Sequence, residues 1–243
     1  MNEGATGTPE EARGYDREIR QLKEHALAMG NWALGMVHDG WEAFKSGNLV
    51  AAQGVLDRDT QLDHFDEEME HEVIAFLVLR RPAAVDLRTA AALLKITTHL
   101  DRIGRLGFDM ARITTSDPGH DTPELTETFR AMDQSVESMV RQALDALVHG
   151  DDDAALTVIG RDDEVDRMHR QATRYVVRDL VHDPLSAQRL SSELLIARHF
   201  ERIADNACKI AENTIYAVTG QRRSEYLPRH PYRPYALEKP RGQ

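Results

Sequence analysis

Two carboxylates four residues apart, Glu201 and Asp205, lie in a long helical stretch of the sequence. On an α-helix this spacing places both side chains on one face, one turn apart. A weaker copy of the stretch occurs 100 residues earlier, where Asp101 takes the place of Glu201 and Arg105 that of Asp205. Two acids on one helix face can bind a cation, whereas the copy replaces one acid by the opposite charge.

A second group of carboxylates lies in two other stretches with strict four-three alternation, the spacing of a packed helical seam. Asp162 takes the place of Asp59 in this pattern, and Asp63 and Asp166 follow them by one turn. An ionised carboxylate at a core-facing position is costly unless a cation, an arginine or water compensates it. The seam positions read Val55, Asp59, Leu62, Asp66, Met69, Val73 and Phe76 in the first half, and Val158, Asp162, Val165, His169, Ala172 and Val176 in the second.

Facing helices that each carry two carboxylates are the usual way in which helical bundles hold metal ions with oxygen ligands. Four residues of the second half would suffice for one or more such ions: Asp162, Asp166, Glu201 and Asp205. A solvated acidic face is the structural alternative, because acid pairs on amphipathic helices are common. In the first half, Arg105 can neutralise Asp101 or Asp59 without a metal. We therefore expect metal in the second half rather than the first.

The elements that must position these residues are all helical. Apolar residues recur at three-and-four spacing, and Pro and Gly fall at the ends of the stretches. The pattern predicts helices over residues 15–45, 49–80, 84–115, 123–148, 151–181 and 185–218. The second three repeat the first three at offsets of 103 and 100 residues, so we expect an all-α fold of two tandem, pseudo-symmetric three-helix bundles. The expected parts are a flexible N-terminus (1–14), two bundles (15–117 and 118–220) and a basic, proline-rich tail (221–243) that forms no helix.

Composition limits the possible partners of this chain. Its 243 residues carry a net charge of −11, and we expect no nucleic-acid partner because such binding needs a basic face. One cysteine, Cys208, excludes an intrachain disulfide and favours a reducing compartment such as the cytoplasm. The N-terminal residues lack the apolar segment of a signal peptide. The longest apolar run, Val73–Leu79, is far shorter than the ~20 residues that span a bilayer, so we expect no membrane insertion.

Signatures of enzymatic chemistry are sparse. The sequence has no G-x-S-x-G, P-loop or dinucleotide fingerprint. Glu68 and His71 form one Glu-x-x-His, the spacing of di-iron bundles, but the partner motif that such sites need is missing. His99 and His199 precede the acids by two residues and therefore point to other faces.

Three stretches carry a resemblance to a known family. Residues 200–207, which read Phe-Glu-Arg-Ile-Ala-Asp-Asn-Ala, and the segment from Ile210 to Gly220 closely resemble the C-terminal signature of the PhoU family of bacterial phosphate-uptake regulators. The segment from Pro82 to Gly104 resembles the corresponding part of the family's first half. The resemblance covers about residues 15–220.

This resemblance implies a fold of two three-helix bundles side by side in a cytoplasmic, often dimeric protein that is not an enzyme. It implies two partners, the ATPase subunit of the phosphate ABC transporter and a membrane sensor histidine kinase. The family's acid-x-x-x-Asp motif, which holds iron or zinc clusters in some members, maps onto Asp162, Asp166, Glu201 and Asp205, and in the first half onto Asp59, Asp63, Asp101 and Asp109. Arg105 departs from the pattern where the family has Asp, and Lys209 departs where Asn is usual.

Two other hypotheses remain open at this stage. A metal-carboxylate enzyme of the ferritin-like bundle class would need open coordination positions and a second Glu-x-x-His. A structural bundle without metal would leave the acid pairs solvated. The leading hypothesis is a non-enzymatic regulator of phosphate uptake and phosphate-starvation signalling.

Overall fold

The computed structural model describes residues 9–82, 84–117 and 123–226, and within these ranges it contains helices and no strand. The predicted all-α class is therefore confirmed for the described residues. The elements are α1 (Pro9–Ser46), α2 (Leu49–Leu56), α3 (Asp59–Arg80), α4 (Ala84–Ser116), α5 (Pro123–His149), α6 (Asp152–Gly160), α7 (Asp162–His182), the 3₁₀ turn η1 (Pro184–Ser186), α8 (Ala187–Thr219) and α9 (Arg223–Tyr226).

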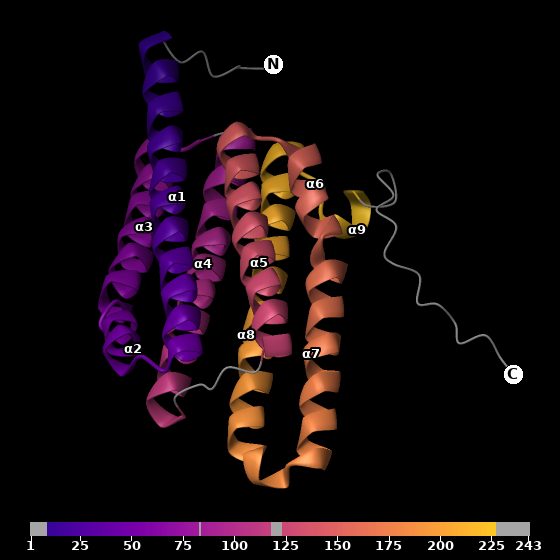
Figure 1. Ribbon diagram of the computed structural model, residues 1–243. Coiled ribbons are helices and arrows are strands. Elements are labelled where there is room, and N and C mark those ends of the chain that lie inside the picture. Colours follow the sequence, from indigo (N-terminus) through magenta and orange to yellow (C-terminus); the bar gives the residue numbers. More distant parts are fainter. Residues whose placement is uncertain (1–8, 83, 118–122, 227–243) are drawn as a thin grey trace, which may run out of the picture.

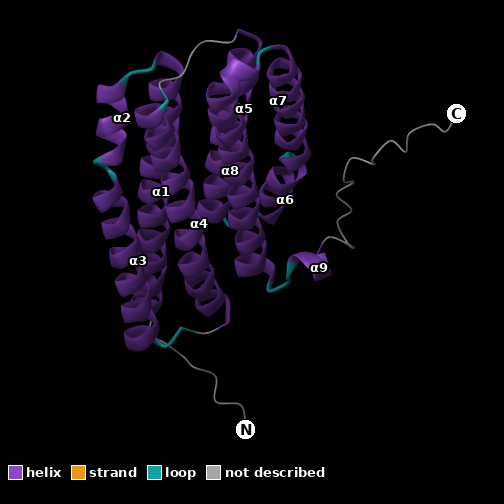
Figure 2. Cartoon of the chain, turned by 90° about the horizontal axis from the view of Figure 1, so that it is seen from below, coloured by secondary structure: helices purple, strands orange, loops and turns teal. Residues whose placement is uncertain are grey.

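The helices form two bundles that lie side by side. Figure 1 shows α1, α2–α3 and α4 on one side and α5, α6–α7 and α8 on the other, and Figure 2 shows the same grouping from below. α4 packs against both α1 and α8, so the two bundles share one continuous hydrophobic core. The predicted pair of tandem three-helix bundles is confirmed in this arrangement.

Matching turns close the first hairpin of each half. Gly47 and Gly150 adopt left-handed φ values of 62° and 68° where α1 and α5 end, a conformation that glycine reaches without steric cost. The next residues, Asn48 and Asp151, cap α2 and α6 by accepting backbone hydrogen bonds from the first turn. The duplicated sequence thus encodes the same local turn twice.

The middle helix of each half is broken, which corrects the prediction of continuous helices over 49–80 and 151–181. The break lies at Asp57–Arg58 in the first half and at Arg161 in the second. Arg58 forms an ion pair of 2.7 Å with Asp39 on α1. Arg161, at the matching position, donates a hydrogen bond of 2.8 Å to Ser138 on α5. A matched arginine therefore ties each break to the first helix of its own bundle.

Both ends of the chain also differ from prediction. α1 begins at Pro9, before the expected start at residue 15, while residues 1–8 lie outside the described part. The expectation of no helix after residue 220 is wrong for Arg223–Tyr226. Tyr226 is buried, and its hydroxyl lies 2.7 Å from Asp152 at the start of α6, so this turn is held by a non-local contact. The remainder of the predicted tail, 227–243, is outside the described residues.

An aromatic cluster joins the two bundles. The ring of Trp41 on α1 lies 5.3 Å from that of Phe129 on α5 and 6.0 Å from that of Phe200 on α8, each in an edge-to-face arrangement. All three side chains are buried. Edge-to-face pairs add stabilisation beyond the area they bury. Phe200 directly precedes Glu201, so the cluster also anchors the helix that carries the acid pair.

Two glycines allow α1 and α4 to approach closely. A methyl group placed on Gly40 would lie 2.5 Å from the carbonyl oxygen of Gly107. One placed on Gly107 would lie 2.5 Å from backbone atoms of Met36 and Val37. Backbone atoms cannot rotate away as a side chain can, so any larger residue must push the helices apart.

We predict that Gly107→Ala lowers the free energy of unfolding by about 2–3 kcal/mol, because it overpacks this contact. Gly54→Ala is the control, since nothing lies within 4 Å of the added methyl group in α2. It should raise the free energy of unfolding by about 0.5–1 kcal/mol through helix propensity. Urea unfolding followed by circular dichroism measures both, and equal effects of the two substitutions would contradict the close packing.

Candidate carboxylate site

The second bundle brings four predicted acids to the edge between α7 and α8. Asp162 is the first residue of α7, and Asp166 lies one turn further on. Glu201 and Asp205 lie on the facing helix α8, and their charges act on those of α7. The break before α7 places Asp162 at a helix start, which the prediction of one continuous helix missed.

Burial and mutual repulsion raise the pKa values of three of these acids. The pKa of Asp162 is raised to about 6, first by burial and then by the charges of Asp205 and Asp166. Burial also raises the pKa of Glu201 and of Asp205, with further contributions from the neighbouring acids. A helix start favours an anion, but here burial and like charges outweigh that effect.

Two arginines compensate this group in part. Arg198 forms an ion pair of 2.8 Å with Glu201, and Arg170 one of 3.4 Å with Asp166. The second carboxylate oxygen of Glu201, Oε2, is buried without a hydrogen-bond partner among the described residues. A buried anionic oxygen with no donor is costly, so this atom has unused capacity for a cation.

Metal ligation would require rotation of these side chains. Within the described parts of the chain, no three histidine, cysteine, aspartate or glutamate side chains converge on a common point as ligands do. The donor atoms fit a cation, because all of them are carboxylate oxygens. Nearby negative charges also raise the pKa values of Asp162, Glu201 and Asp205. The second-bundle acids therefore form an anionic cluster that the two arginines compensate only in part. Their oxygens do not point to a common centre.

In the first bundle an arginine compensates the charges of the matching acids. Arg105 on α4 lies between three aspartates, at 3.2 Å from Asp59, 3.1 Å from Asp101 and in direct contact with Asp63. Burial still raises the pKa of Asp101, while Arg105 lowers it. The guanidinium occupies the place between the acids, so these residues do not fit a metal cluster.

Asp109 is not brought to the first-bundle acids. It pairs with Arg112 at 2.7 Å on its own helix, and its charge acts on His199 of α8. His199 is buried with a pKa lowered first by burial, and His99 lies 2.9 Å from Asn206 across α4 and α8. Both histidines therefore lie in the contact between the bundles, on other helix faces than Asp101 and Glu201, as their spacing predicts.

Sequence reasoning missed several neighbours of the acids. Arg198 precedes Glu201 by three residues and Arg170 follows Asp166 by four, so helical spacing was a usable signal. Asp66 belongs to the first group, because the charges of Asp101 and Asp63 help burial to raise its pKa. The effect of Cys208 in lowering the pKa of Asp162 has no local signal, since it depends on how α8 packs against α7.

The fold and this site define a class: an all-helical protein of two tandem three-helix bundles with acids at the edge between the second and third helical segments of each. The profile of the PhoU domain matches residues 26–114 and 129–214. The chain therefore belongs to the PhoU family, and the resemblance inferred from the signatures is confirmed.

The matches to individual relatives cover about four fifths or more of each relative's own length. A protein of Pseudomonas putida named phosphate-specific transport system accessory protein PhoU homolog is 34% identical over 85% of this chain and 81% of its own. A homolog of the same name from Caulobacter vibrioides is 30% identical over 91% of this chain and 97% of its own. The crystal structure of PhoU from Pseudomonas aeruginosa has a TM-score of 0.78 at 32% identity, over 85% of this chain and 100% of its own.

Two further observations bear on the fold. A crystal structure of the phosphate transport system regulatory protein PhoU from Streptococcus pneumoniae has a TM-score of 0.78 at 22% identity, over 85% of this chain and 98% of its own, and shows shared fold alone. Among the residues that the structure describes, no helix combines the length and the apolar character that crossing a membrane requires.

We predict that Asp162→Asn stabilises the metal-free protein at about pH 7 by ~1 kcal/mol, a value discounted for solvent screening. The folded pKa of about 6 exceeds that of the unfolded chain, so the folded protein binds the proton more tightly. The stabilisation that comes from the tighter proton binding of the folded state is complete below about pH 4 and is lost as the pH rises through about 6. The gain should therefore shrink toward about pH 4.

Urea unfolding in the presence of a chelator at both pH values measures this difference. Glu164→Gln, which removes a charge from the exposed side of the same turn, is the control. An Asp162→Asn variant that is less stable than the parent at both pH values would show that the carboxylate is well compensated, contrary to this interpretation.

Proposed function

We propose that this protein regulates phosphate uptake and phosphate-starvation signalling. The observation that carries the proposal is the family match in both bundles, together with relatives at 30% identity or more that are named phosphate-specific transport system accessory proteins. It acts as a non-enzymatic adaptor in the cytoplasm, between the ATPase subunit of the phosphate ABC transporter and a sensor histidine kinase. We also propose that it works as a homodimer.

The chemistry of the chain supports an adaptor rather than an enzyme. The single cysteine is buried, and burial raises the pKa of its thiol, so Cys208 is not a thiolate nucleophile. The Glu-x-x-His of the ferritin-like alternative is also engaged elsewhere: Glu68 lies 3.0 Å from His64 and 3.7 Å from His25. These contacts place the motif away from the carboxylate cluster of the second bundle.

In the second bundle we propose that metal ions are held by Asp162, Asp166, Glu201 and Asp205. Such an ion would supply positive charge to an anionic group that two arginines compensate only in part. The acids would then hold α7 against α8 with their charges neutralised. Iron or zinc is expected from the resemblance, although an all-oxygen donor set also suits harder ions. In the first bundle Arg105 supplies the charge instead.

Metal content distinguishes the two bundles. We predict that the Glu201→Ala, Asp205→Ala double variant loses at least about nine-tenths of the metal that copurifies with the parent protein, because two of four ligands are gone. The Asp59→Ala, Asp101→Ala double variant removes two first-bundle acids, the counterparts of Asp162 and Glu201, and should keep the parental content. Elemental analysis of both proteins measures this. Full retention by the first variant would rule out the assignment, and a metal-free parent would support a purely structural bundle.

The regulatory role is tested in cells. Deletion of the gene should raise expression from a phosphate-starvation promoter in phosphate-replete medium by about tenfold or more, since the signal of sufficient phosphate is no longer relayed. A plasmid copy should restore repression. The tagged protein should also retain the transporter ATPase and the kinase from detergent-solubilised membranes. Unchanged promoter activity in the deletion strain would contradict the proposed function.

A further inference from the structure

The apolar run Val73–Leu79 is only partly absorbed by the core. Val73 and Phe76 are buried, as the seam pattern predicts. Ile74, Val78 and Leu79, however, are 47%, 67% and 77% exposed on the last two turns of α3. Exposed apolar side chains that lie next to one another on a helix commonly mark an interaction surface.

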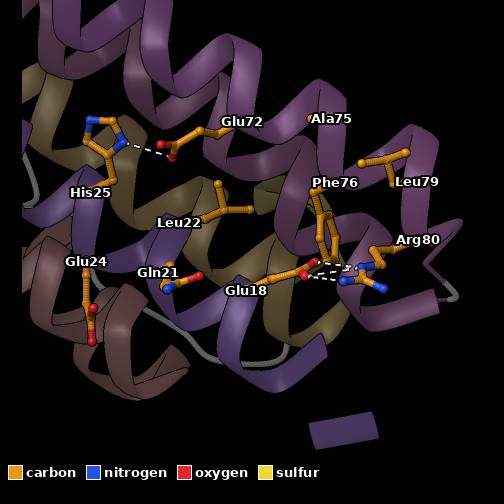
Figure 3. A pocket seen from close by; sticks show the side chains of 10 residues that line it. All are labelled: Glu18, Gln21, Leu22, Glu24, His25, Glu72, Ala75, Phe76, Leu79 and Arg80. Carbon is orange, nitrogen blue, oxygen red and sulfur yellow. Dashed lines mark hydrogen bonds and ion pairs between the residues drawn. The ribbon is translucent and has the colours of Figure 1, made fainter. Parts of the chain in front are cut away.

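A groove of about 600 Å³ opens beside this surface, between α1 and α3. Figure 3 shows Leu22 and Phe76 at the centre of the groove and Leu79 toward one end, near Arg80. Leu22 and Phe76 are 4% and 5% exposed, so they form the floor of the groove with only a small part of their side chains. Leu79 is mostly exposed at its rim. We call this feature the α1–α3 groove.

The polar lining of the α1–α3 groove is acidic. Glu18, Glu24 and Glu72 line it, against one guanidinium, that of Arg80. That guanidinium is already paired with Glu18 at 2.9 Å. Glu72 contacts the His25 ring nitrogen Nδ1 at 2.9 Å, and its side chain is 51% exposed. The groove therefore combines an apolar centre with excess negative charge.

The duplicated fold does not require these residues. At the matching positions of α7, 103 residues later, Tyr175 stands for Glu72 and Arg178 for Ala75. The exposed aliphatic residues Ile74 and Val78 are repeated as Val177 and Val181, which are 56% and 75% exposed, whereas His182 stands for Leu79. Glu24 is repeated as Glu127 at the same offset, so the two bundles differ in Glu72 and Leu79 rather than in every acid of the groove. Because the second bundle folds in the same way without an acid at the position of Glu72, that charge is a feature of the first bundle and not of the shared scaffold.

We propose that the α1–α3 groove docks an amphipathic helical segment of a partner protein, with a bulky aliphatic or aromatic anchor flanked by lysine or arginine. The anchor would lie on Phe76 and Leu79, and the cations would meet Glu72 and the other acids of the lining. A helix laid in a groove is a common mode of peptide recognition. A second copy of this chain fits less well, because its net charge is −11 and the groove is itself acidic.

This inference rests on the proposed function for the source of the segment. The cytoplasmic loops of membrane proteins carry an excess of lysine and arginine. A transporter complex therefore presents basic segments on the side where the adaptor is proposed to act. The α1–α3 groove would be the surface that binds these segments.

The probe for this proposal is a fluorescein-labelled amphipathic peptide of about four helical turns, with leucine and phenylalanine on one face and lysine and arginine on its flanks. Fluorescence anisotropy measures its binding to the full-length protein. Leu79→Asp removes the apolar rim and Glu72→Lys reverses a charge of the lining, and each should weaken binding by about tenfold or more. Both side chains are exposed, and unchanged circular dichroism verifies that the variants fold.

Two control variants match these changes outside the groove. Val181→Asp places the same charge on the matching turn of the second bundle, and Glu67→Lys makes the same charge reversal at an exposed position of α3 that does not line the groove. Both should bind the peptide within about twofold of the parent at moderate salt. Equal weakening by test and control variants, or equal binding of a peptide with glutamate in place of its lysine and arginine, would overturn the proposal.

Two further measurements separate the outcomes. Loss of self-association in Leu79→Asp, seen by sedimentation, would show that a second copy occupies the groove and would overturn the basic-segment assignment. In cells, derepression by Leu79→Asp and Glu72→Lys but not by their controls would support the proposal. If gene deletion derepresses the promoter while both groove variants bind the peptide and repress normally, the docking inference fails and the proposed function stands. If deletion itself has no effect, the proposed function fails.

Discussion

Carboxylates at the edge of a helix pair must meet positive charge or stay partly protonated, and this constraint shapes both halves of the chain. In the first bundle Arg105 lies between Asp59, Asp63 and Asp101 and supplies positive charge from within the protein. In the second bundle Asp205 stands at the position of Arg105, and the pKa of Asp162 rises to about 6. One exchange of charge therefore turns one of two equivalent edges into a group that still attracts cations.

The scaffold that presents these edges is held by close backbone contact and by aromatic packing. Gly40 and Gly107 bring α1 and α4 into direct contact, and α4 in turn packs on α8. Trp41 and Phe200 meet at the junction of the bundles, next to the acid pair of α8. Because interiors are closely packed, a shift of α8 in one bundle would be felt by α4 in the other. The two halves are thus packed as one unit, although the charges on their edges differ.

The asymmetry extends beyond the carboxylates. The first bundle carries an acidic groove beside exposed Val78 and Leu79, whereas the second has Tyr175 and Arg178 at matching positions of its wall. Duplicated folds can diverge in this way because surface residues contribute little to the shared core. The two bundles of this chain are therefore equivalent as structures and distinct as surfaces.

The sequence by itself determined the helical segments, their duplication and the family, because these depend on local signals. Gly47-Asn48 and Gly150-Asp151 end and cap helices through residues adjacent in the chain. Only the tertiary structure decided which acids meet. Asp109 shares a helix with Asp101, yet its charge acts on His199 of α8, and Tyr226 is held by Asp152 from a distant turn. Such contacts depend on how helices pack against each other, and the spacing of residues along one helix does not contain that information.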